Sequence, residues 1–306
     1  MSEVYFEWKD KESGYFFKFK KLLERKTKFH DIVLAESSIF GKVLILDGIV
    51  QFSETDEFFY HESLVQPAIH VLDGVKNALI LGGGDGFSAN EFFKHEDTQK
   101  IVVVDIEEEV ANISKDYFPK LNENVFSNPK LEFHVGDALE FIERTDEKFD
   151  AIIMDLTDPG QTVGNIFYRD EFFQKCKRIL SEHSVFVTHG SSFSVATPTA
   201  ARVYVGFKKS FDYAKFYRSE FIPSFHTPMG FLMGSTFELN FDFEKIETRY
   251  EKVKDKLNYY DVQVHKCMFS RPKWLKKILD NATPLPKGYK EIFSSGVFPP
   301  DMLPEF

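Results

Sequence analysis

Residues 82–86, GGGDG, join a glycine turn to an acidic side chain and are the first candidate for chemistry. They follow the apolar run ALIL at 78–81, so a buried strand leads directly into the turn. Glycines such as Gly82 and Gly84 let the backbone approach a ligand closely, as in nucleotide-binding α/β folds. Asp85 would repel a pyrophosphate, because like charges repel strongly at short range. The segment therefore predicts a nucleoside-like ligand that carries positive charge.

Four more aspartates follow later apolar runs in the same way. IVVVD ends in Asp105, at a position where α/β folds commonly hold ribose hydroxyls. LEFHV leads to Asp137, which could accept a hydrogen bond from an exocyclic amino group such as that of adenine. FDAIIMD ends in Asp155, with Asp158 shortly after it. Because ligands of open α/β sheets bind at the carboxyl ends of the strands, we expect these acids and Asp85 to line one acidic cleft.

Each of these aspartates, taken singly, is equally well explained as a turn residue or a helix N-cap. Their shared place at one edge of the sheet favours a ligand site. Clustered carboxylates also bind metal ions. These five lie on four separate loops without a DxD or His-x-x-His arrangement, so we expect a site without metal.

The rest of the pattern predicts the elements that position these side chains. Residues 1 to about 70 contain strand-like runs with turn signals at Gly41 and Asp47-Gly48, which predict a small antiparallel β domain. From about residue 75 onward, strand and helix patterns alternate, which predicts an α/β domain with a mostly parallel sheet and right-handed crossovers. We therefore expect two domains, 1–72 and 73–306.

Composition narrows the class of protein. A chain of 306 residues with 43% hydrophobic content can build one or two sizeable cores. Its 38 basic and 48 acidic residues give a net charge of −10, which argues against nucleic acid and favours cationic small molecules. Cys176 and Cys267 have neither metal nor disulfide spacing, so a reducing cytoplasm is expected. No apolar run approaches the roughly 20 residues of a membrane span, so no membrane association is expected.

Several segments together resemble the polyamine aminopropyltransferases, the family of spermidine, spermine and thermospermine synthases. In the family's order they are the block at 29–62 that contains DEFFYHE, then LILGGGDG, VVDIEEEV, VGDALEF, MDLTDP, IPSF and LNYYDVQVHKCMFSRPKWLKK. The resemblance implies a Rossmann-like domain of the S-adenosylmethionine type, in a homodimer or homotetramer. It implies transfer of an aminopropyl group from decarboxylated S-adenosylmethionine to a polyamine substrate, with release of methylthioadenosine and no other cofactor.

The resemblance also implies roles for individual residues. Only the neutral lone pair of an amine can attack carbon, so a base must take its proton; the resemblance makes Asp155 this base and places Tyr60 against the attacking nitrogen. The implied donor-binding residues are His30, Gln51, Gly82, Gly84, Asp85, Asp105, Ile106, Asp137 and Ala138. The implied amine-binding residues are His61, Glu62, Asp158 and Phe225. For His61 a hydrogen-bonded core imidazole is an equally good interpretation.

Asp85 then has a role in choosing the donor. Ordinary S-adenosylmethionine carries a carboxylate beside its α-ammonium, whereas the decarboxylated donor ends in an ammonium alone. A fixed acid attracts the second ligand and repels the carboxylate of the first.

Three positions depart from the commoner family pattern. His30 stands where glutamine is usual, Asn90 where arginine is usual, and Phe225 where many spermidine synthases have tyrosine. The phenyl ring of Phe225 lacks a hydroxyl for the amine, and IPSF is closer to the thermospermine synthases. The acceptor is therefore open between putrescine, which gives spermidine, and spermidine, which gives a tetraamine such as thermospermine. A methyltransferase that uses intact S-adenosylmethionine on small molecules, or a catalytically inactive polyamine-binding protein, remain alternatives on the same fold.

Overall fold

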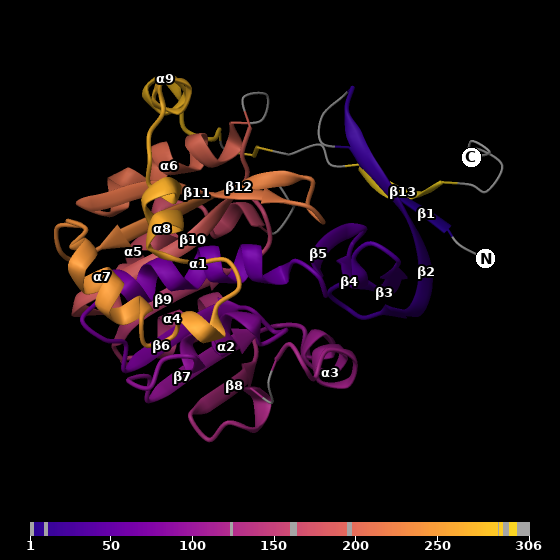
Figure 1. Cartoon of the computed structure of the whole chain (residues 1–306), viewed down its shortest axis with the longest axis horizontal. Coiled ribbons are helices and arrows are strands. Elements are labelled where there is room, and N and C mark those ends of the chain that lie inside the picture. Colours follow the sequence, from indigo (N-terminus) through magenta and orange to yellow (C-terminus); the bar gives the residue numbers. More distant parts are fainter. Residues whose placement is uncertain are drawn as a thin grey trace. The chain divides into compact units, whose positions relative to one another are not determined.

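The computed structural model describes residues 3–8, 12–122, 125–159, 164–194, 198–286, 288–289 and 294–298. The chain forms two compact units (Figure 1). Unit 1 comprises Met1–Glu57, Phe221–Thr227 and Glu291–Phe306, and unit 2 comprises Phe58–Glu220 and Pro228–Lys290.

This division differs from the expected boundary at 72/73 for two physical reasons. Residues 58–71 belong to a helix that is buried within unit 2. Later segments also return to the N-terminal sheet, where Ser224 N–H donates to Asp56 Oδ2 at 2.7 Å and residues 294–298 pair with the first strand. The boundary between the units depends on contacts between segments that are distant in sequence. Local hydrophobic and turn patterns in the sequence do not predict such contacts.

Unit 1 contains an antiparallel sheet that has six strands in the described residues, in the order β13-β1-β2-β3-β4-β5. The strands are β1 (Glu3–Trp8), β2 (Gly14–Lys26), β3 (Asp31–Ser37), β4 (Gly41–Leu46), β5 (Ile49–Ser53) and β13 (Ser294–Phe298). Alternation along β2 buries Phe17 and Phe19 in an apolar core and leaves Phe16 62% exposed. The predicted N-terminal antiparallel domain is confirmed.

Unit 2 contains a mixed sheet of seven described strands in the order β11-β12-β10-β9-β6-β7-β8. The strands are β6 (Asn77–Gly82), β7 (Lys100–Asp105), β8 (Leu131–Val135), β9 (Phe149–Asp155), β10 (Leu180–Ser192), β11 (Tyr213–Ile222) and β12 (Thr227–Ser235). Strands β6 to β10 are parallel, and β12 runs antiparallel to β10. The register pairs Gly82 with Asp155, and Asp105 with Val135. The ends of β6, β7, β8 and β9 therefore meet at one edge, as the sequence predicted.

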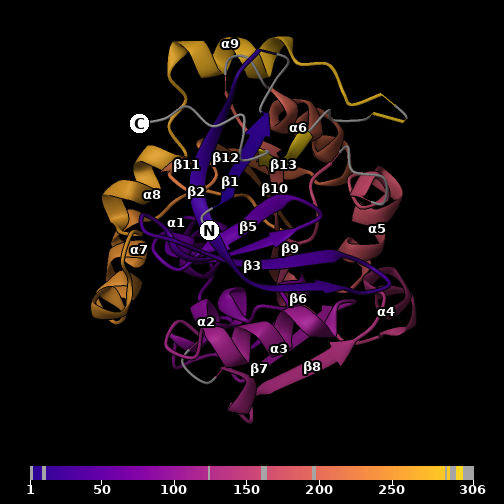
Figure 2. The same ribbon diagram turned by 90° about the vertical axis from the view of Figure 1, so that its right-hand side faces the viewer.

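Helices cover both faces of this sheet, with α1, α2, α7 and α8 on one face and α4, α5 and α6 on the other (Figure 2). The helices are α1 (Glu57–Val71), α2 (Phe87–Phe93), α3 (Glu108–Tyr117), α4 (Ala138–Arg144), α5 (Asp170–Arg178), α6 (Thr199–Ser210), α7 (Phe243–Tyr250), α8 (Val262–Met268) and α9 (Lys273–Asn281), with 3₁₀ turns η1 (Val125–Ser127), η2 (Gly164–Ile166) and η3 (Lys254–Lys256). One apolar core joins α4, α5, α6 and α9 to the sheet.

The alternation read from the sequence corresponds to real elements. The strands expected at 78–81, 101–105, 131–135, 151–155 and 185–189 fall within β6 to β10. The predicted α/β class with a mostly parallel, Rossmann-like sheet is therefore confirmed. Among the helices of the described ranges, none combines the length and the apolar character needed to cross a membrane.

Candidate active site

The turn after β6 depends on two close backbone approaches. Gly82 has a φ of 82°, and a Cβ atom there would lie 2.1 Å from the carbonyl oxygen of Asp155. A Cβ atom on Gly84 would lie 2.8 Å from the carboxyl carbon of Asp105. Because Gly84 has no side chain, its N–H reaches Asp105 Oδ2 at 2.8 Å. The glycines therefore let the ends of β6, β7 and β9 come together.

Asp85, Asp105 and Asp137, here called the loop carboxylates, are held mainly by N–H groups close to them in sequence. Asp85 Oδ1 accepts from Phe87 N at 2.9 Å, and Asp105 Oδ1 accepts from Glu107 N at 2.7 Å. Asp137 caps α4 and accepts two first-turn N–H groups with Oδ1. Each one is thus a turn or cap residue that also stands at the strand ends.

The carboxyl group of Asp85 lies in a desolvated and acidic place. The residue as a whole is partly exposed, but burial of the carboxyl raises its pKa to about 7. The imidazole of His61 opposes this rise in pKa, and the charges of Asp155 and Asp105 add to it. Unit 2 therefore holds an acid that changes charge near neutral pH and that a bound cation would ionise.

Two hydroxyl groups from distant elements fix the carboxylate of Asp155. Tyr60 of α1 donates its hydroxyl to Oδ1 at 2.8 Å, and Ser88 of α2 donates to Oδ2 at 2.9 Å. Burial raises the pKa of Tyr60 well above its usual value, and the charge of Asp155 raises it further. The phenol therefore stays protonated and remains a donor. A carboxylate oriented in this way retains acceptor capacity for a proton from a ligand.

Asp158 faces His189, a residue that the sequence analysis did not single out. His189 lies in β10 opposite Phe231 of β12 and is 4% exposed. Its Nδ1 is 3.5 Å from Asp158 Oδ1, and its Nε2 is 2.6 Å from the carbonyl oxygen of Leu156. The sequence did offer one signal: His189 ends the apolar run VFVTH, just as Asp105 and Asp155 end theirs. Asp155 and Asp158, with these partners, are here called the β9 carboxylates.

His61 is buried between aromatic rings. Its ring packs edge-on against Tyr60 and Phe87, with centroid distances of 5.1 and 5.2 Å. Because it also acts on the carboxyl of Asp85, it lies on the side of the loop carboxylates. Ile106, 36% exposed, and buried Ala138 directly follow two of those carboxylates in sequence.

Glu62 is fully buried and binds backbone. Its carboxylate accepts the N–H groups of residues 258, 259 and 260 at 2.8, 2.9 and 2.7 Å. Lys94 Nζ lies 3.7 Å from Glu62 Oε1 and 2.5 Å from Glu91 Oε1. Burial raises the pKa of Glu91 to about 7, Lys94 opposes this rise, and the charge of Glu62 adds to it. These contacts make Glu62 an anchor for the segment before α8.

Three of the residues predicted from the sequence belong to unit 1, namely His30, Gln51 and Phe225. His30 Nδ1 lies 2.7 Å from Asp47 Oδ2. Gln51 donates from Nε2 to the carbonyl oxygen of Ile49 at 3.1 Å. Phe225 packs, partly buried, against the apolar core of that unit.

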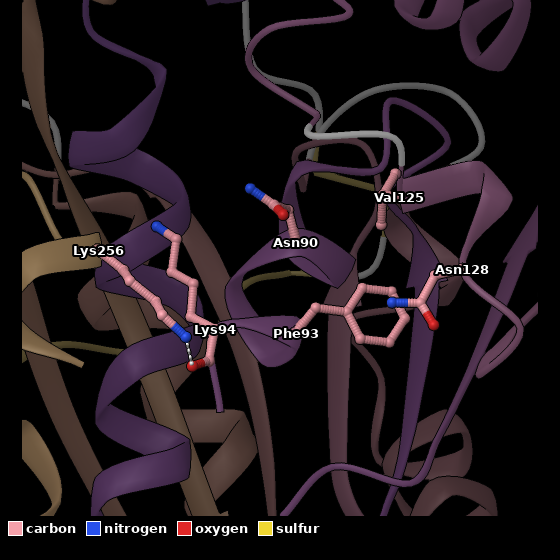
Figure 3. Close-up of a pocket in the computed structure, with 6 residues that line it drawn as sticks. All are labelled: Asn90, Phe93, Lys94, Val125, Asn128 and Lys256. Atoms are coloured by element: carbon pink, nitrogen blue, oxygen red, sulfur yellow. Dashed lines mark hydrogen bonds between the residues drawn. The ribbon is translucent and has the colours of Figure 1, made fainter. Parts of the chain in front are cut away.

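A pocket of about 220 Å³ lies beside α2 (Figure 3). Its lining residues are Asn90, Phe93, Lys94, Val125, Asn128 and Lys256. Lys256 Nζ closes one side by donating to the carbonyl oxygen of Lys94 at 2.9 Å. Neither the loop carboxylates nor the β9 carboxylates line this pocket, so Asn90 faces a separate space.

The fold is that of a Rossmann-like domain, and five aspartates stand at or directly after the ends of four of its parallel strands. Within the described residues, no group of three or more His, Cys, Asp or Glu side chains is arranged to hold a metal ion. The profile described as "Spermine/spermidine synthase domain" matches residues 57–245. The profile described as "Spermidine synthase tetramerisation domain" matches residues 4–54. The chain belongs to the spermine/spermidine synthase family, which confirms the resemblance read from its motifs.

Individual relatives match over most of their length. The chain is 35% identical over 275 residues to the polyamine aminopropyltransferase of Buchnera aphidicola subsp. Schizaphis graminum, covering 88% of this chain and 95% of that protein. It is 36% identical over 266 residues to that of Sulfurisphaera tokodaii, covering 85% and 87%. A crystal structure of spermidine synthase in complex with the transition state analogue AdoDATO is similar with a TM-score of 0.83 at 27% identity, covering 90% and 94%. Spermidine synthase from Thermotoga maritima gives a TM-score of 0.80 at 27% identity, with the same coverage.

Proposed function

We propose that this protein transfers the aminopropyl group of decarboxylated S-adenosylmethionine to a primary amine of a polyamine and releases methylthioadenosine. The observation that carries the proposal is the carboxylate of Asp155, held by Tyr60 and Ser88 at the end of β9. Membership of the spermine/spermidine synthase family supports it.

In this reaction the amine nitrogen forms a bond to the methylene carbon beside the sulfonium. The carbon–sulfur bond breaks, and its electron pair leaves with sulfur, which becomes a neutral thioether. Asp155 takes the proton that the attacking ammonium must lose, and Tyr60 orients both Asp155 and the nitrogen. A carboxylate is a much weaker base than an amine. The rate enhancement therefore comes from the position of Asp155 and from desolvation of the amine, which lowers the amine's own pKa.

The loop carboxylates hold the donor in this proposal. Asp85 binds the donor's terminal ammonium, Asp105 the ribose hydroxyls, and Asp137 the exocyclic amino group of adenine. Gly82 and Gly84 allow the donor to approach the backbone, and Ile106 and Ala138 contact the adenine ring. His30 and Gln51 are also proposed as donor-binding residues.

Asp158 is proposed to bind an ammonium group of the acceptor amine, and Phe225 is proposed as a further amine-binding residue. His61 and Glu62 act around this site, Glu62 by anchoring residues 258–260. Spermidine is proposed as at least a competitive acceptor beside putrescine, because a phenyl ring offers no polar contact by which to select the shorter amine. The donor is a co-substrate, and no further cofactor or metal is assigned.

The protein is further proposed to act as a cytoplasmic homo-oligomer, a dimer or a tetramer. The match of residues 4–54 to a tetramerisation domain supports assembly. The two free cysteines, buried Cys176 and exposed Cys267, are in keeping with a reducing compartment. Light scattering after size-exclusion chromatography measures the assembly directly.

Product analysis tests the activity. The protein is incubated with decarboxylated S-adenosylmethionine and, separately, putrescine, spermidine and longer amines, and the products are identified by mass spectrometry. We expect methylthioadenosine together with an amine lengthened by one aminopropyl group. A methylated product from intact S-adenosylmethionine would instead identify a methyltransferase, and amine binding without turnover would identify an inactive binding protein.

A further inference from the structure

A chain of hydrogen bonds that starts beyond helix α3 reaches the main chain of Asp85. Ser114 of α3 is buried, and its hydroxyl donates to the carbonyl oxygen of Asp85 at 2.5 Å. Asn122 is also buried, and its Nδ2 donates to the Ser114 carbonyl oxygen at 3.0 Å and to the Ser114 hydroxyl oxygen at 3.4 Å. A carbonyl oxygen can only accept a hydrogen bond, so the hydroxyl proton of Ser114 points to Asp85. The chain therefore runs in one direction and ends on the residue proposed to bind the donor's ammonium.

The bond from Ser114 ties the turn after β6 to a separate element, whereas two other bonds in this turn are local. Asp85 Oδ1 accepts from Phe87 N, two residues further on, so this bond moves with the turn. The bond from Gly86 N to the carbonyl oxygen of Gly83, at 3.0 Å, lies within the turn. Both glycines have positive φ values, and glycine by itself restricts the backbone little. Because the buried residues of α3 lie along one face, Ser114 connects Asp85 to a packed helix.

Electrostatics explains why the turn needs this support. Burial raises the pKa of the Asp85 carboxyl to about 7; the imidazole of His61 opposes the rise, and the charges of Asp155 and Asp105 add to it. An ionised Asp85 would therefore gain free energy by moving toward water and away from the other two acids. A glycine turn permits such a movement. The bond from Ser114 opposes it, because the movement would leave a buried hydroxyl and a carbonyl oxygen without each other as partners.

We propose that Ser114 is a positioning residue for donor selection and that Asn122 orients its hydroxyl. By holding the main chain of Asp85, Ser114 keeps the carboxylate in the desolvated place where it attracts an ammonium and repels the carboxylate of intact S-adenosylmethionine. In a more solvated place both interactions would be weaker, because water screens them. This inference rests on the proposed function in taking decarboxylated S-adenosylmethionine as the donor. It adds two residues that act on the choice of donor through Asp85.

Calorimetric titration of three ligands into Ser114→Ala tests this role. The ligands are decarboxylated S-adenosylmethionine, intact S-adenosylmethionine and methylthioadenosine. Because one neutral hydrogen bond is lost, affinity for the decarboxylated donor should fall by roughly 2- to 10-fold. Affinity for the intact compound should stay the same or rise, because its carboxylate is repelled less, so the preference for the decarboxylated donor should fall by at least the same factor. Methylthioadenosine, which has no ammonium, should bind as before.

A second measurement separates positioning of the carboxylate from a general loss of packing. Ionisation of Asp85 on donor binding releases a proton, and a carboxyl group that has moved toward water has a lower pKa than the value of about 7 in the unmodified protein. At about pH 7, Ser114→Ala should therefore release fewer protons per donor bound than the unmodified enzyme. Calorimetry in two buffers of different ionisation enthalpy counts these protons.

Three further variants complete the test. Ser114→Thr keeps the hydroxyl and should keep both the donor preference and the proton release. Asn122→Ala leaves the hydroxyl without its orienting donor and should change both quantities in the same direction as Ser114→Ala, but by less. Ser184→Ala is the matched control, because it removes another buried serine hydroxyl that donates to a carbonyl oxygen, that of Ser181 at 2.7 Å. It should leave the binding of all three ligands unchanged.

Two results would overturn the proposal. One is an equal loss of affinity for all three ligands in Ser114→Ala, which would show a general effect on the nucleoside site. The other is an unchanged donor preference with unchanged proton release in both Ser114→Ala and Asn122→Ala. Either result leaves the proposed activity intact, because that activity is judged by product formation in the unmodified enzyme.

Discussion

The loop carboxylates and the β9 carboxylates stand at the same edge of one sheet but are held in different ways. Asp85 and Asp137 accept N–H groups two or three residues further along the chain. Asp155 accepts hydroxyls from residues 95 and 67 positions away. A carboxylate tied to its own turn is fixed as soon as that turn forms. The orientation of Asp155 depends on the packing of α1 and α2. We therefore expect donor binding and chemical reactivity to be separable by mutation.

Asp155→Asn should have the largest effect. The amide keeps the shape of the side chain but cannot take a proton, so turnover should fall by about 10²- to 10⁴-fold. Methylthioadenosine should bind with nearly unchanged affinity. Steady-state rates and calorimetry measure both quantities. Asp146→Asn, at an aspartate whose side chain is fully exposed, is the control and should match the unmodified enzyme.

Tyr60→Phe tests how far the reaction depends on the orientation of Asp155. It removes the hydroxyl that holds Asp155 Oδ1 and leaves the ring in place. A hydrogen bond to a charged group contributes about 1.5 to 3 kcal/mol, so turnover should fall by roughly 10- to 150-fold. Tyr217→Phe removes another buried hydroxyl, whose bond to the carbonyl oxygen of Leu64 is long at 3.5 Å. Equal losses of rate in the two variants would mean that turnover depends on the packing of buried tyrosines in general and not on the hydrogen bond to Asp155.

Asp85→Asn probes the loop carboxylates. Affinity for decarboxylated S-adenosylmethionine should fall by about 1 to 3 kcal/mol, and affinity for intact S-adenosylmethionine should fall less. Methylthioadenosine, which has no ammonium, should be unaffected. Equal losses for the intact and decarboxylated ligands in calorimetry would exclude selection by charge at Asp85.

The raised pKa of Asp85 adds a pH dependence to donor binding. The carboxyl has a pKa of about 7 in the unliganded protein, and the donor's ammonium favours its ionised form. Below that pH, donor binding must therefore release a proton, and affinity should increase as the pH rises through about 7. Calorimetry in buffers of different ionisation enthalpy detects the released proton. Asp85→Asn should abolish the release, and persistence of the release would assign it to another group.

Phe225→Tyr should have the smallest effect. The added hydroxyl can contribute a neutral hydrogen bond of about 0.5 to 1.5 kcal/mol. Preference should therefore shift toward putrescine by roughly 2- to 10-fold in kcat/KM relative to spermidine. If the unmodified protein already used putrescine far better than longer amines and the substitution changed nothing, Phe225 would have no part in choosing the acceptor.

The difference between side chains held by neighbouring residues and side chains held by distant residues also explains how much of the site the sequence could predict. Asp85, Asp105 and Asp137 were found because a glycine turn or a helix start directly follows an apolar strand. Most of the N–H groups that anchor them lie in the same motif, and the exception is Gly84, which donates to Asp105 from 21 residues away. His189 was missed because its contacts are with Leu156 and Asp158, which lie in the loop after the neighbouring strand β9. The binding of Glu62 to the backbone of residues 258–260 was hidden for the same reason. Likewise, periodicity predicted the parallel strands β6 to β10, but it gave no sign that residues 221–227 and 294–298 belong with the N-terminal sheet.

The separation of the two groups of carboxylates is tested most directly by measuring two quantities on Asp85→Asn and Asp155→Asn side by side. These are the Kd for decarboxylated S-adenosylmethionine and the single-turnover rate with donor and amine both saturating. We predict that Asp85→Asn weakens donor binding and keeps most of the rate, and that Asp155→Asn keeps donor affinity and loses at least about 10²-fold in rate. Asp155→Asn with more than about a tenth of the rate, or with a loss of donor affinity equal to that of Asp85→Asn, would contradict the account.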